Sequence, residues 1–392
     1  MAKAIFFSIP AYGHTNPTLP VVQELVRRGD EIVYYSTPEF KERVLATGAL
    51  YREYQIKQDD QFLTRSGKDI AFLYYSLVKI TQNILNHLLA DVQEIHPDYI
   101  LHDAICPWGR FVASICNLPA VSSISTFALN AHVVSLKKSV DFFRSNPLRS
   151  IKYILDAQNI QKELHCQYGI QPRSLVQTMM NEENLNIVYT SSQMQPNADR
   201  FDLEKYKFVG PSIAQRVNDP DTTDYSKLNH PLIYISMGTI WKDSYKIEDL
   251  VEALGDLGGA LVISGIDENH TYDNHDKVIL KSHINQLEVL KYCDVFVTHG
   301  GMNSVNEALY WGVPMCLHPF QVEQEIVADR VVELQCGLRI DRFSQMDISK
   351  KVKRLIKEKR FRENCSLISQ SFKEAGGYRQ AAEYILAHTR SV

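Results

Sequence analysis

The feature that most constrains the fold of this chain is an alternation of short β-rich runs with helical patterns. In the first half, the helical patterns cover residues 19–28, which end at Gly29, and residues 70–95. The β-rich runs between and after them are 4–9, 31–36, 99–101, 120–123 and 185–190. Such alternation is typical of βαβ units, in which crossover helices connect parallel strands. It predicts a doubly wound α/β sheet.

A second alternation of the same kind begins after a polar segment, residues 215–229, which Pro220 interrupts. Its expected strands are residues 232–236, 260–264, 278–281, 295–298 and 315–318. A single hydrophobic core tends to split beyond about 250 to 300 residues, and this chain has 392. Two Rossmann-like domains are therefore expected.

These patterns give a predicted domain organisation. We expect a first domain over 1–214, a linker over 215–229 and a second domain over 230–375. A helical, aromatic region at about 137–184 should form an inserted cover on the first domain. The last helical pattern, 376–392, has no strand after it and is expected to pack back on the first domain.

Composition excludes several classes of protein. The chain is 45% hydrophobic and 22% charged, as in packed globular proteins, and its net charge of -4 provides no basic field for nucleic acid. The first apolar stretch, 4–11, is too short to span a bilayer and runs into a turn rather than a cleavage site. We therefore expect neither a nucleic-acid nor a membrane partner.

The cysteines indicate a reducing compartment. They are odd in number, they are scattered, and they include no C-x-x-C pair. The simplest interpretation is that they are buried thiols acting as small hydrophobes. With the absence of an export signal, this predicts a cytoplasmic protein; the seven positions are Cys106, Cys116, Cys166, Cys293, Cys316, Cys336 and Cys365.

The densest candidate site follows the expected strand 295–298. Gly300 and Gly301 allow a sharp turn and a close approach to a ligand, and the next helix presents unpaired N–H groups and a positive dipole end. Such a turn suits a diphosphate. A second interpretation stays open, because Ser304 and Glu307 also have the spacing of a capping box.

His14 marks a second candidate site. It lies in the segment Tyr12-Gly13-His14-Thr15-Asn16-Pro17, between the first strand and the first helix. That place is an edge of a parallel sheet, where ligands bind in such folds. The chain has 13 histidines, and only the location distinguishes this one.

Several ordered motifs resemble the nucleotide-sugar signature of family 1 glycosyltransferases. The likeness is greatest to the bacterial macrolide-glycosyltransferase branch, which includes Bacillus-type enzymes that glucosylate flavonoids and other natural products, and it covers almost the whole chain. The motifs are Gln286-Leu287-Glu288-Val289-Leu290, His299-Gly300-Gly301-Met302-Asn303-Ser304, Glu307, Gly312-Val313-Pro314, Pro319 and Glu323-Gln324.

The resemblance implies a GT-B fold, with two Rossmann-like lobes that face a cleft and a donor held mainly by the second lobe. It implies that Gln286 and Glu307 bind the ribose and that Glu323 and Gln324 contact the sugar. The diphosphate would be held by His299, Gly301, Asn303 and Ser304 and by the loop Ser236, Gly238 and Thr239.

The nucleobase position departs from the plant pattern. His283 stands where plant members usually have a tryptophan that stacks on uracil, and Ile284 follows it. Stacking on an aromatic ring contributes about 1 to 3 kcal/mol per base, and a histidine ring would keep part of that. Uridine diphosphate sugars are expected first, with thymidine diphosphate sugars tolerated.

The resemblance assigns the general base to His14 and its carboxylate partner to Asp103. A base is needed because an alcohol is a weak nucleophile, and imidazole has a suitable pKa. The expected reaction inverts the anomeric carbon and uses no metal or other cofactor. Two alternatives remain: Asp103 could cap a helix near Cys106, and Asp219-Pro220-Asp221 is a literal D-x-D that we interpret as linker.

The acceptor should be a small, apolar, hydroxylated molecule such as a flavonoid or macrolide, bound by the first domain. The aromatic members of its expected lining could also be ordinary core; the candidates are Ser125, Thr126, Phe127, Phe142 and Phe143. Two competing functions stay open. One is another GT-B enzyme, such as a cell-wall precursor transferase or a nucleotide-sugar epimerase, and the other is a non-catalytic nucleotide-sugar-binding protein.

Overall fold

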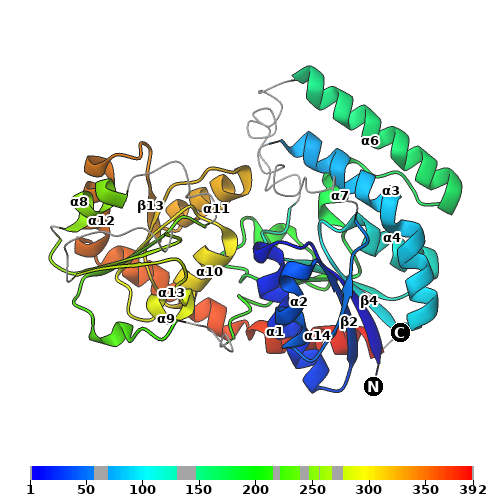
Figure 1. Cartoon of the computed structure of the whole chain (residues 1–392), viewed down its shortest axis with the longest axis horizontal. Helices are drawn as coiled ribbons and strands as arrows, with labels where there is room; N and C mark the ends of the chain where they lie inside the picture. The colour runs from blue at the N-terminus through cyan, green and yellow to red at the C-terminus, as the bar shows by residue number, and fades with distance from the viewer. Residues whose placement is uncertain are drawn as a thin grey trace. The chain divides into compact units, whose positions relative to one another are not determined.

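The computed structural model describes residues 2–56, 69–129, 147–214, 221–238, 247–255, 257–266 and 277–390. The chain divides into two compact units, and each has its own parallel sheet (Figure 1). The first unit combines Met1–Ser212 with the end of the chain, Ala375–Val392. The second unit is Ile213–Glu374.

The first unit contains a seven-stranded sheet in the order β3-β2-β1-β4-β5-β6-β7. Every neighbouring pair is parallel. The order reverses between β1 and β4, which makes the carboxyl edge of these two strands the expected ligand position of a doubly wound sheet. The strands are β1 (Lys3–Phe7), β2 (Glu31–Ser36), β3 (Leu50–Glu53), β4 (Tyr99–Asp103), β5 (Ala120–Ile124), β6 (Leu185–Val188) and β7 (Tyr206–Phe208).

Helices cover both faces of this sheet, so its central strands are apolar on both sides. Ile5 and Phe7 of β1 belong to the core beneath α3 and α4, whereas Ala4 and Phe6 belong to the core beneath α1 and α14. This alternation follows from the two-residue period of a strand. The helices are α1 (Tyr12–Arg27), α2 (Lys41–Leu45), α3 (Ile70–Ile95), α4 (Pro107–Cys116), α6 (Pro147–Tyr168), α7 (Leu175–Met180) and α14 (Gly377–Arg390).

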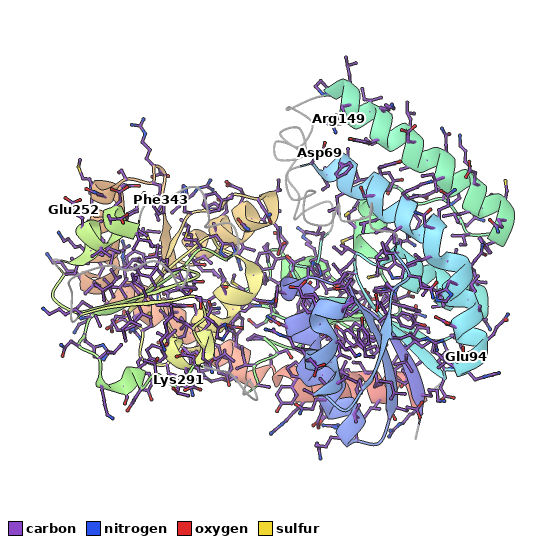
Figure 2. All side chains as sticks on the ribbon, viewed as in Figure 1. Asp69, Glu94, Arg149, Glu252, Lys291 and Phe343 are labelled. Atoms are coloured by element: carbon purple, nitrogen blue, oxygen red, sulfur yellow. The ribbon has the colours of Figure 1, made fainter. Side chains whose placement is uncertain are left out.

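The helix pair α3 and α6 forms an outer layer of the first unit (Figure 1). The two helices run in the same direction, since Tyr153 packs on Phe72 and Tyr75 near their starts and Glu163 accepts from Gln82 farther along. Figure 2 labels Asp69 and Arg149 at these starts. In the described part of the chain, no helix has both the length and the apolar character needed to cross a membrane.

The second unit repeats the arrangement with a six-stranded parallel sheet in the order β10-β9-β8-β11-β12-β13. Its order reverses between β8 and β11. The strands are β8 (Leu232–Ser236), β9 (Ala260–Ser264), β10 (Val278–Lys281), β11 (Val295–Thr298), β12 (Met315–Leu317) and β13 (Gly337–Arg339). The helices are α8 (Ile247–Gly255), α9 (Gln286–Leu290), α10 (Met302–Tyr310), α11 (Val322–Glu333), α12 (Gln345–Lys357) and α13 (Arg360–Glu374).

Three local features differ from the sequence-based expectation. Helix α1 begins at Tyr12 and continues through Pro17 and Pro20, so His14 lies in its first turn rather than in a preceding loop. The edge strands β3, β7 and β13 were not expected, because they are short and only partly buried. The second unit begins at Ile213 and so includes residues 221–229 of the predicted linker, while 215–220 lie outside the described residues.

Candidate active site

Three strand ends of the first sheet bring His14, Asp103 and Ser125 together. His14 follows β1, Asp103 ends β4 and Ser125 follows β5, and these strands are neighbours in the sheet. Nδ1 of His14 lies 2.7 Å from Oδ2 of Asp103 and 2.9 Å from Oγ of Ser125. The Asp103 side chain is 1% exposed and the His14 side chain 20%. The site therefore joins a buried carboxylate to a partly accessible imidazole at the switch point of the sheet.

The contact with Asp103 determines the protonation pattern of the imidazole. A carboxylate only accepts hydrogen bonds, so Nδ1 of His14 carries a proton and donates a hydrogen bond to Asp103. In a neutral ring the lone pair is then on Nε2. This is the tautomer that a general base needs, and it is the arrangement of a histidine and aspartate in hydrolytic triads.

Asp103 does not cap the following helix. Its Oδ1 accepts from N–H of Ile105 at 2.9 Å in a local turn. Helix α4 has Cys106 as its N-cap residue, without a side-chain cap. The capping alternative for Asp103 is therefore wrong.

A buried polar group supports the strand end that carries Asp103. His102, which is 0% exposed, contacts the carbonyl oxygen of Asp103 through Nδ1 at 3.0 Å and Oε1 of Glu183 through Nε2 at 3.1 Å. Nδ2 of Asn181 donates to the carbonyl oxygen of Ala104 at 2.7 Å. These residues were not predicted from the sequence, because local spacing contains no signal that links residue 102 to residue 183.

In the second sheet, the corresponding switch point brings Gly238 next to His299. Ser236 of β8 pairs with Thr298 of β11, so the residues after both strands are neighbours. A Cβ atom on Gly238, whose φ is +67°, would lie 3.0 Å from Cε1 of His299. On Gly301 it would lie 2.7 Å from Nε2 of the same ring. The imidazole therefore packs against two positions that require glycine.

His299 is neutral at physiological pH. Burial lowers its pKa to about 4, and the main chain of Ser236 opposes this shift in part. Its Nδ1 is buried and has no hydrogen-bond partner among the residues that the structure describes. A neutral ring contributes a dipole rather than a full charge, so positive potential at this edge must come from elsewhere, beginning with the N-terminus of α10.

Helix α10 begins at Met302 with Gly301 as its N-cap residue and no side-chain cap. Ser304 and Glu307 are therefore inside the helix, and the capping-box alternative for them is wrong. Both accept from Nε2 of Gln286, Ser304 at 3.2 Å and Glu307 at 2.7 Å. The structure thus joins three of the predicted donor-binding residues on α9 and α10 into one hydrogen-bonded group.

Other predicted donor residues differ in their burial. His283 and Glu323 are exposed, whereas Ile284 is buried. Gln324 is 5% exposed, and its Oε1 accepts from the main chain of Phe320 and Gln321 at the start of α11. The Gln324 carbonyl thus caps the start of α11, and its contact with the sugar stays a prediction; Thr239 lies outside the described residues.

The predicted acceptor lining is only partly present in the described chain. Ser125 contacts His14, as above, and Thr126 is partly exposed beside it. Phe127 is 2% exposed, so its ring packs in the interior, against the prediction that it lines a ligand site. Phe142 and Phe143 lie outside the described residues.

The likeness to known proteins agrees with this arrangement. Residues 204–375 match the family described as UDP-glucoronosyl and UDP-glucosyl transferase. The chain is 30% identical to the uncharacterized UDP-glucosyltransferase YojK of Bacillus subtilis, over 98% of this chain and 97% of that protein. It is 31% identical to the NDP-glycosyltransferase YjiC of Bacillus licheniformis, over 97% and 96%.

Solved structures show the same fold. The glycotransferase of kitacinnamycin superimposes with a TM-score of 0.85 at 24% identity, over 99% of each chain. The calicheamicin glycosyltransferase CalG4 superimposes with a TM-score of 0.82 at 27% identity, over 100% of this chain and 99% of that chain. The two doubly wound sheets are those of a GT-B glycosyltransferase. The chain belongs to the UDP-glucosyltransferase family, within family 1 glycosyltransferases of the natural-product type.

Proposed function

We propose that this enzyme transfers a hexose, with glucose as the first choice, from a uridine diphosphate sugar to a hydroxyl group of a small apolar acceptor. The observation that carries the proposal is the 2.7 Å contact between Nδ1 of His14 and the buried carboxylate of Asp103. It leaves Nε2 as the basic nitrogen at a sheet edge of the kind that binds ligands. A protein that only binds nucleotide sugars has no need of such a base.

The proposed step is a direct displacement. Nε2 of His14 takes the proton of the acceptor hydroxyl, and the oxygen forms a bond to the anomeric carbon. The bond from that carbon to the diphosphate breaks, and its electron pair leaves with the nucleoside diphosphate. Attack opposite the leaving group inverts the anomeric configuration. Asp103 stabilises the imidazolium that forms, as in a hydrolytic triad.

The second unit supplies the proposed donor site. The diphosphate would bind the N-terminus of α10 and the turn that holds His299, with no divalent cation. Gln286 and Glu307 would bind the ribose hydroxyls, and His283 would contact the nucleobase. Two relatives from Bacillus are named NDP-glycosyltransferases, which supports tolerance of thymidine diphosphate sugars.

The names of two relatives support an apolar, hydroxylated acceptor. One relative, 27% identical over 82% of this chain, is an oleandomycin glycosyltransferase of Streptomyces antibioticus, and another, 22% identical, is a zeaxanthin glucosyltransferase. Both names describe large, mainly apolar alcohols. We propose flavonoids, macrolides or similar cytoplasmic natural products as acceptors.

Mass spectrometry after incubation with UDP-glucose and a panel of phenols and macrolides tests the proposal. A gain of one hexose by an acceptor, lost in His14→Ala while UDP still binds, is the expected result. Release of glucose or an epimerised nucleotide sugar without any acceptor product would overturn it. Full turnover in the presence of excess EDTA is expected, and a requirement for a divalent metal would overturn the metal-free step.

A further inference from the structure

Asp221, the second acidic residue of the D-x-D sequence, is anchored inside the second unit. Its side chain is 1% exposed. Oδ1 accepts from Nζ of Lys281 at 2.7 Å and from Oγ1 of Thr223 at 2.7 Å, and Oδ2 accepts from the hydroxyl of Tyr225 at 2.6 Å. Both carboxylate oxygens are therefore engaged by donors of the protein itself.

One further bond connects Asp221 to the donor-binding segment. Oδ2 also accepts from the main-chain N–H of Asn285 at 2.9 Å, across 64 residues of sequence. Asn285 is the N-cap residue of α9, and its own side chain accepts from N–H of Glu288. Asp221 thus holds the residue at which α9 begins.

Helix α9 connects Asn285 to the proposed nucleotide site. Its first residue, Gln286, donates to Ser304 and Glu307 of α10. Asp221 also binds Lys281, which is the last residue of β10 and lies four residues before Asn285. The carboxylate therefore holds the segment 281–286 at Lys281 and at Asn285, on either side of His283 and Ile284.

The charge of Asp221 makes this attachment strong. Burial alone would raise the pKa of this carboxyl, but the bonds from Lys281, Tyr225, Asn285 and Thr223 outweigh it and hold the pKa well below its usual range. The group is an anion at any working pH. Hydrogen bonds to an ionised acceptor are about twice as strong as neutral ones.

We propose that Asp221 is a positioning residue for the donor nucleotide, which fixes the segment 281–286 in the shape that presents His283 and Gln286 to the base and ribose. The inference rests on the proposed function in one respect, namely that this segment binds a uridine nucleotide. It also explains the D-x-D sequence, whose second carboxylate anchors a loop.

Calorimetric titration of the full-length protein with UDP tests the inference, with Asp221→Asn compared to Asp224→Asn. Asp224 is a matched control, because it lies in the same segment but is exposed, and the partners of its carboxylate among the described residues are its neighbours Ser226 and Lys227. We expect Kd for UDP to rise about tenfold in Asp221→Asn and to change less than about twofold in Asp224→Asn. The kcat of Asp221→Asn at saturating UDP-sugar should stay near that of the unaltered enzyme, because this substitution weakens only the binding of the donor.

Tyr225→Phe gives a milder variant should Asp221→Asn fail to fold. It removes one donor to Oδ2 and keeps the charge, and a two- to fivefold rise in Kd is expected, about the effect of one weakened bond. Unchanged UDP affinity in a folded Asp221→Asn, or in Tyr225→Phe, overturns the inference. If the unaltered protein does not bind UDP at all, the proposed donor is wrong, which is a separate outcome.

Discussion

Gly238 and His299 lie against each other at the carboxyl edge of β8 and β11. A Cβ atom at position 238 would be 3.0 Å from Cε1 of the His299 ring, and the φ of +67° there is one that residues with a side chain rarely adopt. The same ring blocks a Cβ at Gly301. The turn that we propose for the diphosphate is therefore built around the space that one buried imidazole occupies.

This packing predicts that Gly238→Ala weakens nucleotide binding. The new methyl group must displace the His299 ring, so we expect Kd for UDP to rise about tenfold or more. Gly258→Ala is the matched control, because Gly258 has φ of +85° but nothing within 4 Å of its Cβ position. Both variants should lose about 1 to 2 kcal/mol of stability from backbone strain. Equal UDP affinity in the two variants, measured by calorimetry, would contradict the prediction.

The lowered pKa of His299 predicts a loss of stability in mild acid. Its folded pKa is about 4 and its ordinary value 6.5, so the unfolded chain binds the proton first. Above about pH 6.5 the ring is neutral in both states and does not affect the free energy of unfolding. As pH falls toward 4, the free energy of unfolding decreases by up to about 3 kcal/mol. Urea unfolding of His299→Gln should lack this component. Identical pH dependence of unfolding in both proteins would count against it.

Asp103→Asn should separate catalysis from donor binding. An asparagine can turn its amide N–H toward Nδ1 of His14, which moves the ring proton to Nε2 and removes the basic lone pair there. We expect kcat to fall by about 10²- to 10⁴-fold with little change in UDP affinity. Asp98→Asn, at the exposed residue just before the same strand, serves as the control. A fall of less than about threefold in Asp103→Asn would remove the role of this carboxylate.

Glu307→Gln should raise the donor KM more than it lowers kcat. Glu307 is 7% exposed and accepts from Gln286 at 2.7 Å, and the loss of its charge weakens every hydrogen bond that it accepts. We expect KM for the UDP-sugar to rise about five- to tenfold. Glu333→Gln, an exposed partner of Arg330 on α11, should leave KM unchanged. Steady-state kinetics at saturating acceptor distinguish this result from a uniform loss of active protein, which would lower kcat alone.

The buried strands of both sheets could be predicted closely from the sequence. The expected runs 31–36, 232–236, 260–264 and 295–298 coincide with β2, β8, β9 and β11, and the run 278–281 coincides with the partly buried edge strand β10. Strands covered on both faces are continuous apolar runs, which stand out from their polar surroundings. The edge strands β3 and β13 lack that pattern, and β3 has two exposed residues among its four. Proline also misled the prediction at α1, because Pro17 and Pro20 lie within the helix.

The sequence by itself determined the two doubly wound sheets, the glycine-rich turn at Gly300 and Gly301, and the family, because these depend on periodicity and on motifs of a few neighbouring residues. Tertiary structure alone decided that Ser125 contacts a histidine 111 residues away, that Phe127 is interior and that Asp221 binds Asn285. It also decided that His299 is neutral. Contacts of this kind and the burial that shifts a pKa depend on the path of the whole chain, and that path is set by the packing of helices on the sheets.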